Sequence, residues 1–444
     1  MRKRSKILLA FMGLAAATAV LADLAGSYVL PLDDAAIRYA SRPADDPVER
    51  LNRKIAAGEV TLEFDNAHGY LRSVLRALGI PVESQVLVFS KTSFQAALIS
   101  PRTPRALYFN DSTAVGSVHS SDLLEFASVD PKLGVIFYTL DQKKAAKPHF
   151  DRRDAACLQC HDSGGPTLGV PGLMVRSVYP DPSGMPVFQA GDFLTDQRSP
   201  LKERWGGWYV TGTHGEMTHM GNAVARDHDH PEKLEGAAGL NVTDLRGKFD
   251  TGEYLTPHSD IVALMTLEHQ ARMTNLITRV GYETAMTIES QTAFNQAYHQ
   301  PLDELSDGAR HRIDSAVEQL VEYMLFLDEA KLDATIQGTS GFAEAFQKAG
   351  PRDRKGRSLR DFDLTKRMFR YPLSYMIYSE AFDGMPEAAR ARIYRRLFDV
   401  LTEREKSPRY ARLSSDDRRA ILEILRDTKR DLPEYWNTSS ANAR

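Results

Sequence analysis

Cys157-Leu158-Gln159-Cys160-His161 is the stretch around which this chain of 444 residues is organised, and it contains the only two cysteines of the sequence. Short β-branched and aromatic runs precede it, and helical patterns follow it. Two residues separate the sulfurs, and a histidine comes directly after the second one. This C-x-x-C-H spacing is the pattern that attaches a c-type haem. We therefore expect one covalently bound haem at this point of the chain.

The spacing of the motif has a chemical reason. Two intervening residues allow both sulfurs to form thioethers with neighbouring edges of one porphyrin, and the next side chain can then reach the iron. We predict that Cys157 and Cys160 hold the haem and that His161 is the proximal ligand of its iron. The second ring nitrogen of an axial histidine usually donates to a carboxylate or a backbone carbonyl. Asp162 is a candidate for this acceptor.

Two other interpretations of the motif fit the sequence less well. A redox-active dithiol of the thioredoxin type lies between a strand and a helix, whereas polar and glycine-rich flanks surround this motif. A zinc site would need further cysteines or a paired histidine motif, and the sequence has no second cysteine pair. Haem attachment is the interpretation that uses all three side chains.

The first residues predict export. A basic stretch at 1–6 precedes an apolar run at 7–22, which is the pattern of a secretory signal peptide, and small residues suit cleavage before Asp23. Apolar residues continue to Leu32, so an uncleaved anchor in the inner membrane is the alternative. Both interpretations place the rest of the chain in the periplasm, where C-x-x-C-H cysteines receive haem.

The net charge narrows the choice of partner. The formal charge is −3, and it becomes −7 when residues 1–22, with four basic and no acidic side chains, are removed. This balance argues against nucleic acid and favours a periplasmic redox partner protein or a small-molecule oxidant. A hydrophobic fraction of 42% and a charged fraction of 26% are those of an ordinary globular protein.

Strand-like runs fill most of residues 33–145. Each run is rich in β-branched and aromatic residues and is bounded by proline, asparagine, aspartate or glycine, which predicts an antiparallel sheet. Two helical patterns precede the runs, one ending near Gly58 and one at 70–78. The expected strands cover residues 85–90, 106–110, 114–119, 123–128 and 134–140, with 61–64 as a further candidate.

The rest of the chain consists of two parts with different sequence patterns. Residues 146–280 are rich in proline and glycine, and we expect the haem to form the hydrophobic core of this loop-rich segment. Helical periodicity then dominates, so residues 281–444 should form an all-α part. The prediction is an α+β fold with a small β-rich N-terminal module, a haem-binding segment and a helical C-terminal domain. Expected helices cover 259–279, 282–298, 307–329, 341–346, 362–382, 386–403 and 415–432.

The sixth ligand of the iron would decide the chemistry, because a strong ligand favours electron transfer and an open position admits small molecules. On a helix starting near residue 258, positions 258, 265 and 269 fall within roughly 40° of one face. We therefore expect His269 to be the distal ligand, with Met265 as the second choice. The alternative is that Met265 belongs to the core and that His258 caps the helix.

A second candidate for the distal side lies at 204–222, where two of the three tryptophans occur beside glycines. His214 or His219 would act there as a ligand or as an acid/base group, and a tight aromatic turn is the alternative. Haem propionates need cationic partners when they are partly buried. The nearest candidates in sequence are Arg152, Arg153, Arg176 and Arg204.

The motif and four further stretches resemble known proteins. At 157–161 the chain resembles the c-type cytochromes. Together with VLVFSKTSFQ (86–95), PRALYFND (104–111), ERWGGWYVTGTHG (203–215) and PHSDIVALMTLEHQ (257–270), the motif resembles a group of exported bacterial proteins with a cytochrome c domain. The resemblance implies haem attachment at Cys157 and Cys160 and ligation by His161, and it implies no substrate. The chain differs from small cytochromes c in the central position of its motif, and from di-haem peroxidases in lacking a second one.

These observations favour a periplasmic mono-haem c-type cytochrome that transfers electrons. The alternatives are a haem enzyme with an open distal site, of the peroxidase or oxygenase kind, and a haem-based sensor. The large size of the chain favours an enzyme, because electron transfer alone needs no scaffold of this length.

Overall fold

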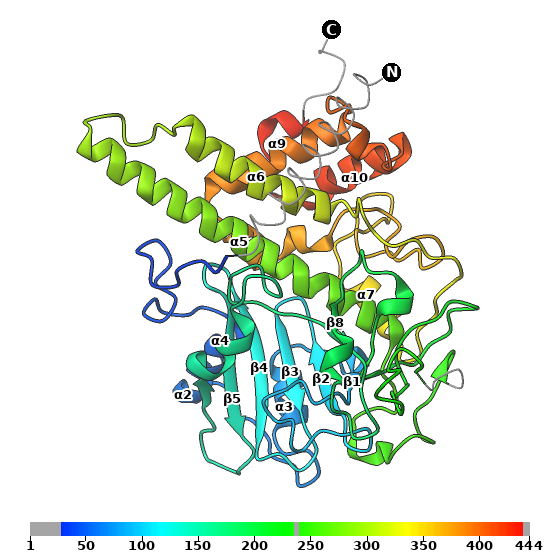
Figure 1. The fold of residues 1–444 in the computed structure, drawn as a ribbon. Helices are drawn as coiled ribbons and strands as arrows, with labels where there is room; N and C mark the ends of the chain where they lie inside the picture. The colour runs from blue at the N-terminus through cyan, green and yellow to red at the C-terminus, as the bar shows by residue number, and fades with distance from the viewer. Residues whose placement is uncertain (1–27, 235–238, 438–444) are drawn as a thin grey trace, which may run out of the picture.

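The fold is α+β, as a computed structural model of the chain shows for residues 28–234 and 239–437 (Figure 1). A seven-stranded antiparallel sheet occupies the N-terminal part and helices occupy the C-terminal part, which confirms the predicted fold class. The signal peptide expected at 1–22 lies outside the described residues. Among the helices of the described part, none is both long enough and apolar enough to cross a membrane.

The large sheet has the strand order β6-β5-β4-β3-β2-β1-β9, and every neighbouring pair is antiparallel. Its five inner strands are the five main expected runs, whereas residues 61–64, the further candidate, form no strand. The two edge strands come from the segment that was expected to consist of loops. The strands are β1 (Val86–Val88), β2 (Arg105–Phe109), β3 (Thr113–Ser117), β4 (Leu123–Asp130), β5 (Gly134–Asp141), β6 (Phe150–Arg152) and β9 (Trp208–Tyr209).

Alternating side chains give this sheet two different faces. One face packs on α2 (Pro47–Ala57) and α3 (Leu71–Ala77) in a core that includes Tyr108 and Phe126. Gly58 ends α2 with a φ of 77°, as the amphipathic pattern predicted. The opposite face contributes to the main core of the molecule. A separate two-stranded sheet pairs β7 (Arg176–Val178) with β8 (Asp192–Leu194).

The longest helix, α5 (Ile261–Ala297), connects the sheet to the C-terminal helices (Figure 1). Two helices were expected here, with a break near residue 280, but α5 continues through Gly281. Asp260 begins the helix, because its carboxylate accepts hydrogen bonds from the backbone amides of Val262 and Ala263. The expected boundary between the haem-binding segment and the helical domain therefore falls inside one helix. Residues of the sheet, of α5 and of the later helices share the main core.

The C-terminal helices pack on α5 and on one another. Helix α5 packs on α6, α6 packs on α9, and α9 packs on α10. The prediction of a helix at 362–382 is wrong, because this segment contains an isolated β-bridge between Phe362 and Phe369 and only short helical turns. The helices are α6 (Asp307–Met324), α7 (Phe342–Lys348), α8 (Glu380–Asp383), α9 (Glu387–Leu401) and α10 (Ser415–Thr428).

Candidate functional site

The cysteine motif forms the second half of a short helix, α4 (Asp154–His161), which directly follows β6 and lies beside β5 (Figure 1). Cys157 is three residues from Cys160 and four from His161, so all three side chains lie on one side of the helix. Both cysteines are free thiols, and Cys157 is partly buried while Cys160 is exposed. The helix thus presents two thiols and an imidazole together.

The His161 ring is held in one orientation. Its Nδ1 atom lies 2.9 Å from the carbonyl oxygen of Gly172, and because a carbonyl can only accept, Nδ1 carries the hydrogen. The ring packs against Phe137 of β5, with 4.7 Å between the ring centroids. Burial lowers the pKa of His161, which keeps the imidazole neutral. In this tautomer the Nε2 lone pair is available to a metal, and the Nδ1–H to carbonyl bond is the usual support of a metal-binding histidine.

The acceptor for His161 differs from the expected one. Asp162 follows the histidine in sequence, but the backbone carbonyl of Gly172 takes its place. The Gly172 amide in turn donates to the carbonyl oxygen of His161 at 2.9 Å. Asn275 of α5 fixes the next residue, since its side chain accepts from the Leu173 amide at 2.8 Å and donates to the Leu173 carbonyl at 2.7 Å. The ring orientation is therefore determined by backbone atoms that α5 holds in place.

The thiol environment bears on the alternative of a redox-active dithiol. The polar and glycine-rich flanks suggested that no strand and helix surround the motif. In the structure, however, the motif follows β6 and lies in α4, as a thioredoxin-type dithiol would. Burial, followed by the nearby carboxylate of Glu125, raises the pKa of the Cys157 thiol to about 11. Reactive dithiols instead need a cysteine with a lowered pKa in an electropositive setting. The surroundings of Cys157 are therefore unfavourable for dithiol chemistry.

His269, the expected distal ligand, is fully buried in α5 and has partners at both ring nitrogens. Nδ1 bonds to the side-chain oxygen of Gln197, and Nε2 lies 2.8 Å from the hydroxyl of Ser374. The ring stacks on Phe326, with 4.8 Å between centroids. Neither nitrogen is left for a metal. Met265 is also buried in the main core, at 3% exposure.

The structure brings His214 and His219 together, with 4.9 Å between their ring centroids, and Trp205 packs on His219. Backbone amides occupy one nitrogen of each ring: Asn241 donates to His214 Nε2 and Gly221 donates to His219 Nδ1. Burial, and then the neighbouring His214, lowers the pKa of His219 to about 3. The two histidine rings and Trp205 therefore form an aromatic cluster, which agrees with the alternative interpretation of this stretch.

The face of the sheet beside α4 contains residues that the sequence did not single out. On β2, β3 and β4, Leu107, Ala114 and Ala127 pack on the main core and yet remain partly exposed. An ion pair lies on the same face, where Arg105 Nη2 is 2.6 Å from Glu125 Oε2. The alternation of the strands could have assigned these residues to one face. Their location beside the motif depends on the register between strands, which cannot be read from the sequence of any one strand.

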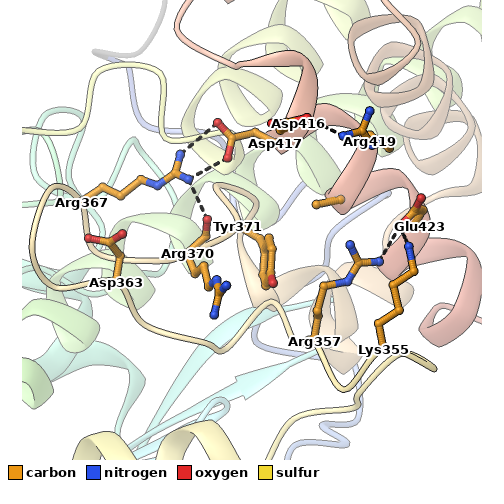
Figure 2. Close-up of a pocket in the computed structure, with 11 residues that line it drawn as sticks. Lys355, Arg357, Asp363, Arg367, Arg370, Tyr371, Asp416, Asp417, Arg419 and Glu423 are labelled. Carbon is orange, nitrogen blue, oxygen red and sulfur yellow. Dashed lines mark hydrogen bonds and ion pairs between the residues drawn. The ribbon is translucent and has the colours of Figure 1, made fainter.

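A polar cavity of about 480 Å³ lies far along the chain, between the 355–371 segment and α10 (Figure 2). Most of its charges are paired with one another, since Arg367 bonds Asp417, and both Lys355 and Arg357 bond Glu423. In the described part of the chain, no group of three or more histidine, cysteine, aspartate or glutamate side chains is arranged to hold a metal ion. The motif helix α4 thus remains the main candidate site.

Comparison with known proteins gives no relative: no family model matches this chain, and no curated protein or solved structure matches it. The argument for function therefore depends on the motif and its geometry.

Proposed function

We propose that this protein is a periplasmic mono-haem c-type cytochrome that transfers electrons, with haem c bonded to Cys157 and Cys160 and with His161 as the proximal ligand. The observation that carries the proposal is the fixed tautomer of His161, whose Nδ1 is bound to the Gly172 carbonyl. A haem bound here would supply one-electron chemistry at its iron. The redox partner would be another periplasmic protein or a small-molecule oxidant.

The side chains of the motif fit this cofactor in three respects. The two thiols are unpaired, and one of them is exposed, so a porphyrin edge can reach them. The imidazole offers Nε2 from the same side of α4. The Gly172 carbonyl increases the basicity of the imidazole and prevents its rotation, and Phe137 shields one side of the ring from water.

The test is production of the full chain in a bacterial host that has the machinery for haem attachment. Wild-type protein should be coloured, and its mass should exceed that of the processed polypeptide by one haem. The double variant Cys157→Ala, Cys160→Ala should carry no covalent haem. Colourless wild-type protein without the added mass would overturn the proposal.

The role of His161 has its own readout. His161→Gly should retain the thioether-bound haem but should lose the absorption spectrum of histidine-ligated iron, and added imidazole should restore it. His149→Gly is the matched control, because His149 is exposed, at 68% of its side chain, and lies just before the motif. An unchanged spectrum in His161→Gly would exclude this histidine as the ligand.

One observation favours a second candidate, a haem enzyme or sensor with an open distal site. His269 was the expected sixth ligand, and both of its nitrogens are engaged elsewhere. An iron without that ligand would accept oxygen, peroxide or carbon monoxide. Prompt binding of carbon monoxide by the reduced protein would favour this candidate, and a low-spin spectrum unaffected by carbon monoxide would favour electron transfer.

A further inference from the structure

We propose that the haem lies on the face of the sheet formed by Leu107, Ala114, Gly116 and Ala127, and that Arg105 binds one of its propionates. This inference deepens the proposed function and depends on it. Three independent features support it, namely the small side chains of this face, the direction in which α4 presents the motif, and an arginine donor without an acceptor.

The register of the strands creates a flat area with small side chains at its centre. Ala114 of β3 is opposite Ala127 of β4, and large rings flank this pair, with Phe109 opposite Ala114 and Phe137 opposite Ala127. In the next row, Gly116 has Leu107 on one side and Glu125 on the other. Partly exposed apolar residues that form a continuous area on a sheet commonly mark a binding surface.

The motif faces this area. The His161 ring packs on Phe137, which ends the row of Ala114 and Ala127. Cys157 packs against the main core, to which the same face of the sheet belongs. The thiols and the imidazole are therefore on the side of the sheet where the small residues lie.

Arg105 is the cation of this surface. Its guanidinium lies over Gly116, where any Cβ would collide with it, and it pairs with Glu125 at 2.6 Å, with side-chain exposures of 22% and 15%. Its Nε atom is buried and has no hydrogen-bond partner among the described residues. A buried donor without a partner is uncommon and calls for an explanation. A propionate carboxylate would supply the acceptor in the planar geometry that a guanidinium prefers.

The arginines expected from the sequence have other partners. Arg204 is buried and bonds Glu268 at 2.8 Å, and Arg176 bonds Asp192 at 2.7 Å. Arg152 bonds Asp154 at 2.9 Å, and Arg153 bonds the hydroxyl of Thr139 at 2.9 Å. Each of these four arginines has a local partner, whereas Arg105 combines a location on this face of the sheet with a buried donor that has no partner among the described residues.

The electrostatic test compares Arg105→Gln with Arg176→Gln, a control that removes a similar ion pair of partial exposure, 36% and 34%. Loss of a cation beside the haem should favour the oxidised form. We expect the one-electron equilibrium of Arg105→Gln to shift about tenfold, or about 59 mV to lower potential, while Arg176→Gln stays close to the wild type. Equal potentials in wild type and Arg105→Gln would overturn the role of Arg105.

The steric test fills the flat area. Ala127→Phe should reduce the covalent haem content or alter circular dichroism in the Soret region, and Ala316→Phe should do neither. Ala316 of α6 is also a partly buried alanine on the main core, and far-UV circular dichroism verifies that both variants fold. Full haem content with an unchanged Soret signal in folded Ala127→Phe would overturn the location. If wild-type protein carries no haem, the proposed function itself fails, so the two failures are distinguishable.

Discussion

At the scale of single residues, the features that matter most are the hydrogen bonds that hold the rings of His161 and His269. The C-x-x-C-H spacing predicts Cys157, Cys160 and His161 as the haem-binding side chains, because haem attachment requires a short fixed spacing along the chain. The acceptor for His161 is a backbone carbonyl at Gly172, and every residue has such a carbonyl, so no side-chain pattern could reveal it. His269 shows the effect of long-range contacts. The helical pattern could suggest that it lies on a buried face, but not that Gln197 and Ser374 would reach its ring from distant segments.

Asn275 gives a prediction at this scale. Asn275→Leu should lower the free energy of unfolding by about 2 kcal/mol, because it leaves the amide and carbonyl of Leu173 without partners in a buried site. It should also change the absorption spectrum, since the adjacent Gly172 carbonyl orients His161. Urea unfolding and absorption spectroscopy on the same samples would measure both effects.

Asn295→Leu is the matched control for that experiment. Asn295 also lies on α5, is 1% exposed, and donates to two backbone carbonyls, those of Pro301 at 2.7 Å and Glu304 at 2.8 Å. Its replacement should cost similar stability and leave the spectrum unchanged. Identical spectra in the two variants would contradict the link between α5 and the histidine.

At the scale of elements, periodicity predicted most strands and helices. It was wrong at two places where a single glycine or proline decides whether a helix continues. Gly281 suggested a break, but glycine costs only about 1 kcal/mol in a helix, and burial of Val280 and Tyr282 on either side stabilises a continuous α5. Pro372 opposes the helix expected at 362–382. A proline in a helix removes an amide donor and displaces the preceding turn, and Leu364 has a φ of 56°, which a helix does not allow.

The pairing of Arg367 with Asp417 gives a prediction about α10 (Figure 2). Two hydrogen bonds, of 2.7 and 3.2 Å, join the guanidinium to the carboxylate near the start of the helix. We expect Arg367→Met to lower the free energy of unfolding by about 1 kcal/mol near neutral pH. Arg354→Met, which removes a pair with Asp427 whose arginine side chain is 89% exposed, should have no measurable effect in the same urea titration.

The pH dependence of this pair follows from its carboxyl group. Burial alone would raise the pKa of Asp417, but hydrogen bonds from Arg367 and Ser414 outweigh burial and hold the pKa below 3.8. A lowered pKa in the folded state means that the stabilisation is present above 3.8 and is lost as the pH falls through the folded value. The difference between wild type and Arg367→Met should therefore shrink in strongly acidic solution. A difference that is constant with pH would exclude the ion pair as its source.

At the scale of the whole molecule, the structure corrects the expectation that haem would form the hydrophobic core of the loop-rich segment. Val175, Trp205 and Val210 of this segment are buried in the main core together with α5 and the sheet. The loops therefore have a core made of protein side chains. Glycine and proline content had suggested otherwise, because composition reports local conformation and not which distant elements cover a segment.

A variant without the proposed haem attachment tests this correction. The variant Cys157→Ala, Cys160→Ala should keep its far-UV circular dichroism and a cooperative thermal transition, with Tm lowered by only about 2–4 °C, because Cys157 only packs at the border of a main core that other side chains form. Differential scanning calorimetry beside the wild-type protein would measure the change. Loss of the cooperative transition in the double variant would mean that haem is an obligatory part of the core after all.

The continuity of α5 also limits how this molecule can be divided. The first half of the helix belongs to the same core as the sheet, and α5 also packs on α6, where Tyr323 stacks on His269. A gene truncated at codon 280 would leave each fragment with half a helix and an uncovered apolar surface, so neither fragment should be usable as a stand-alone module. In engineered chimaeras and fusions, no junction should therefore be placed within residues 261–297.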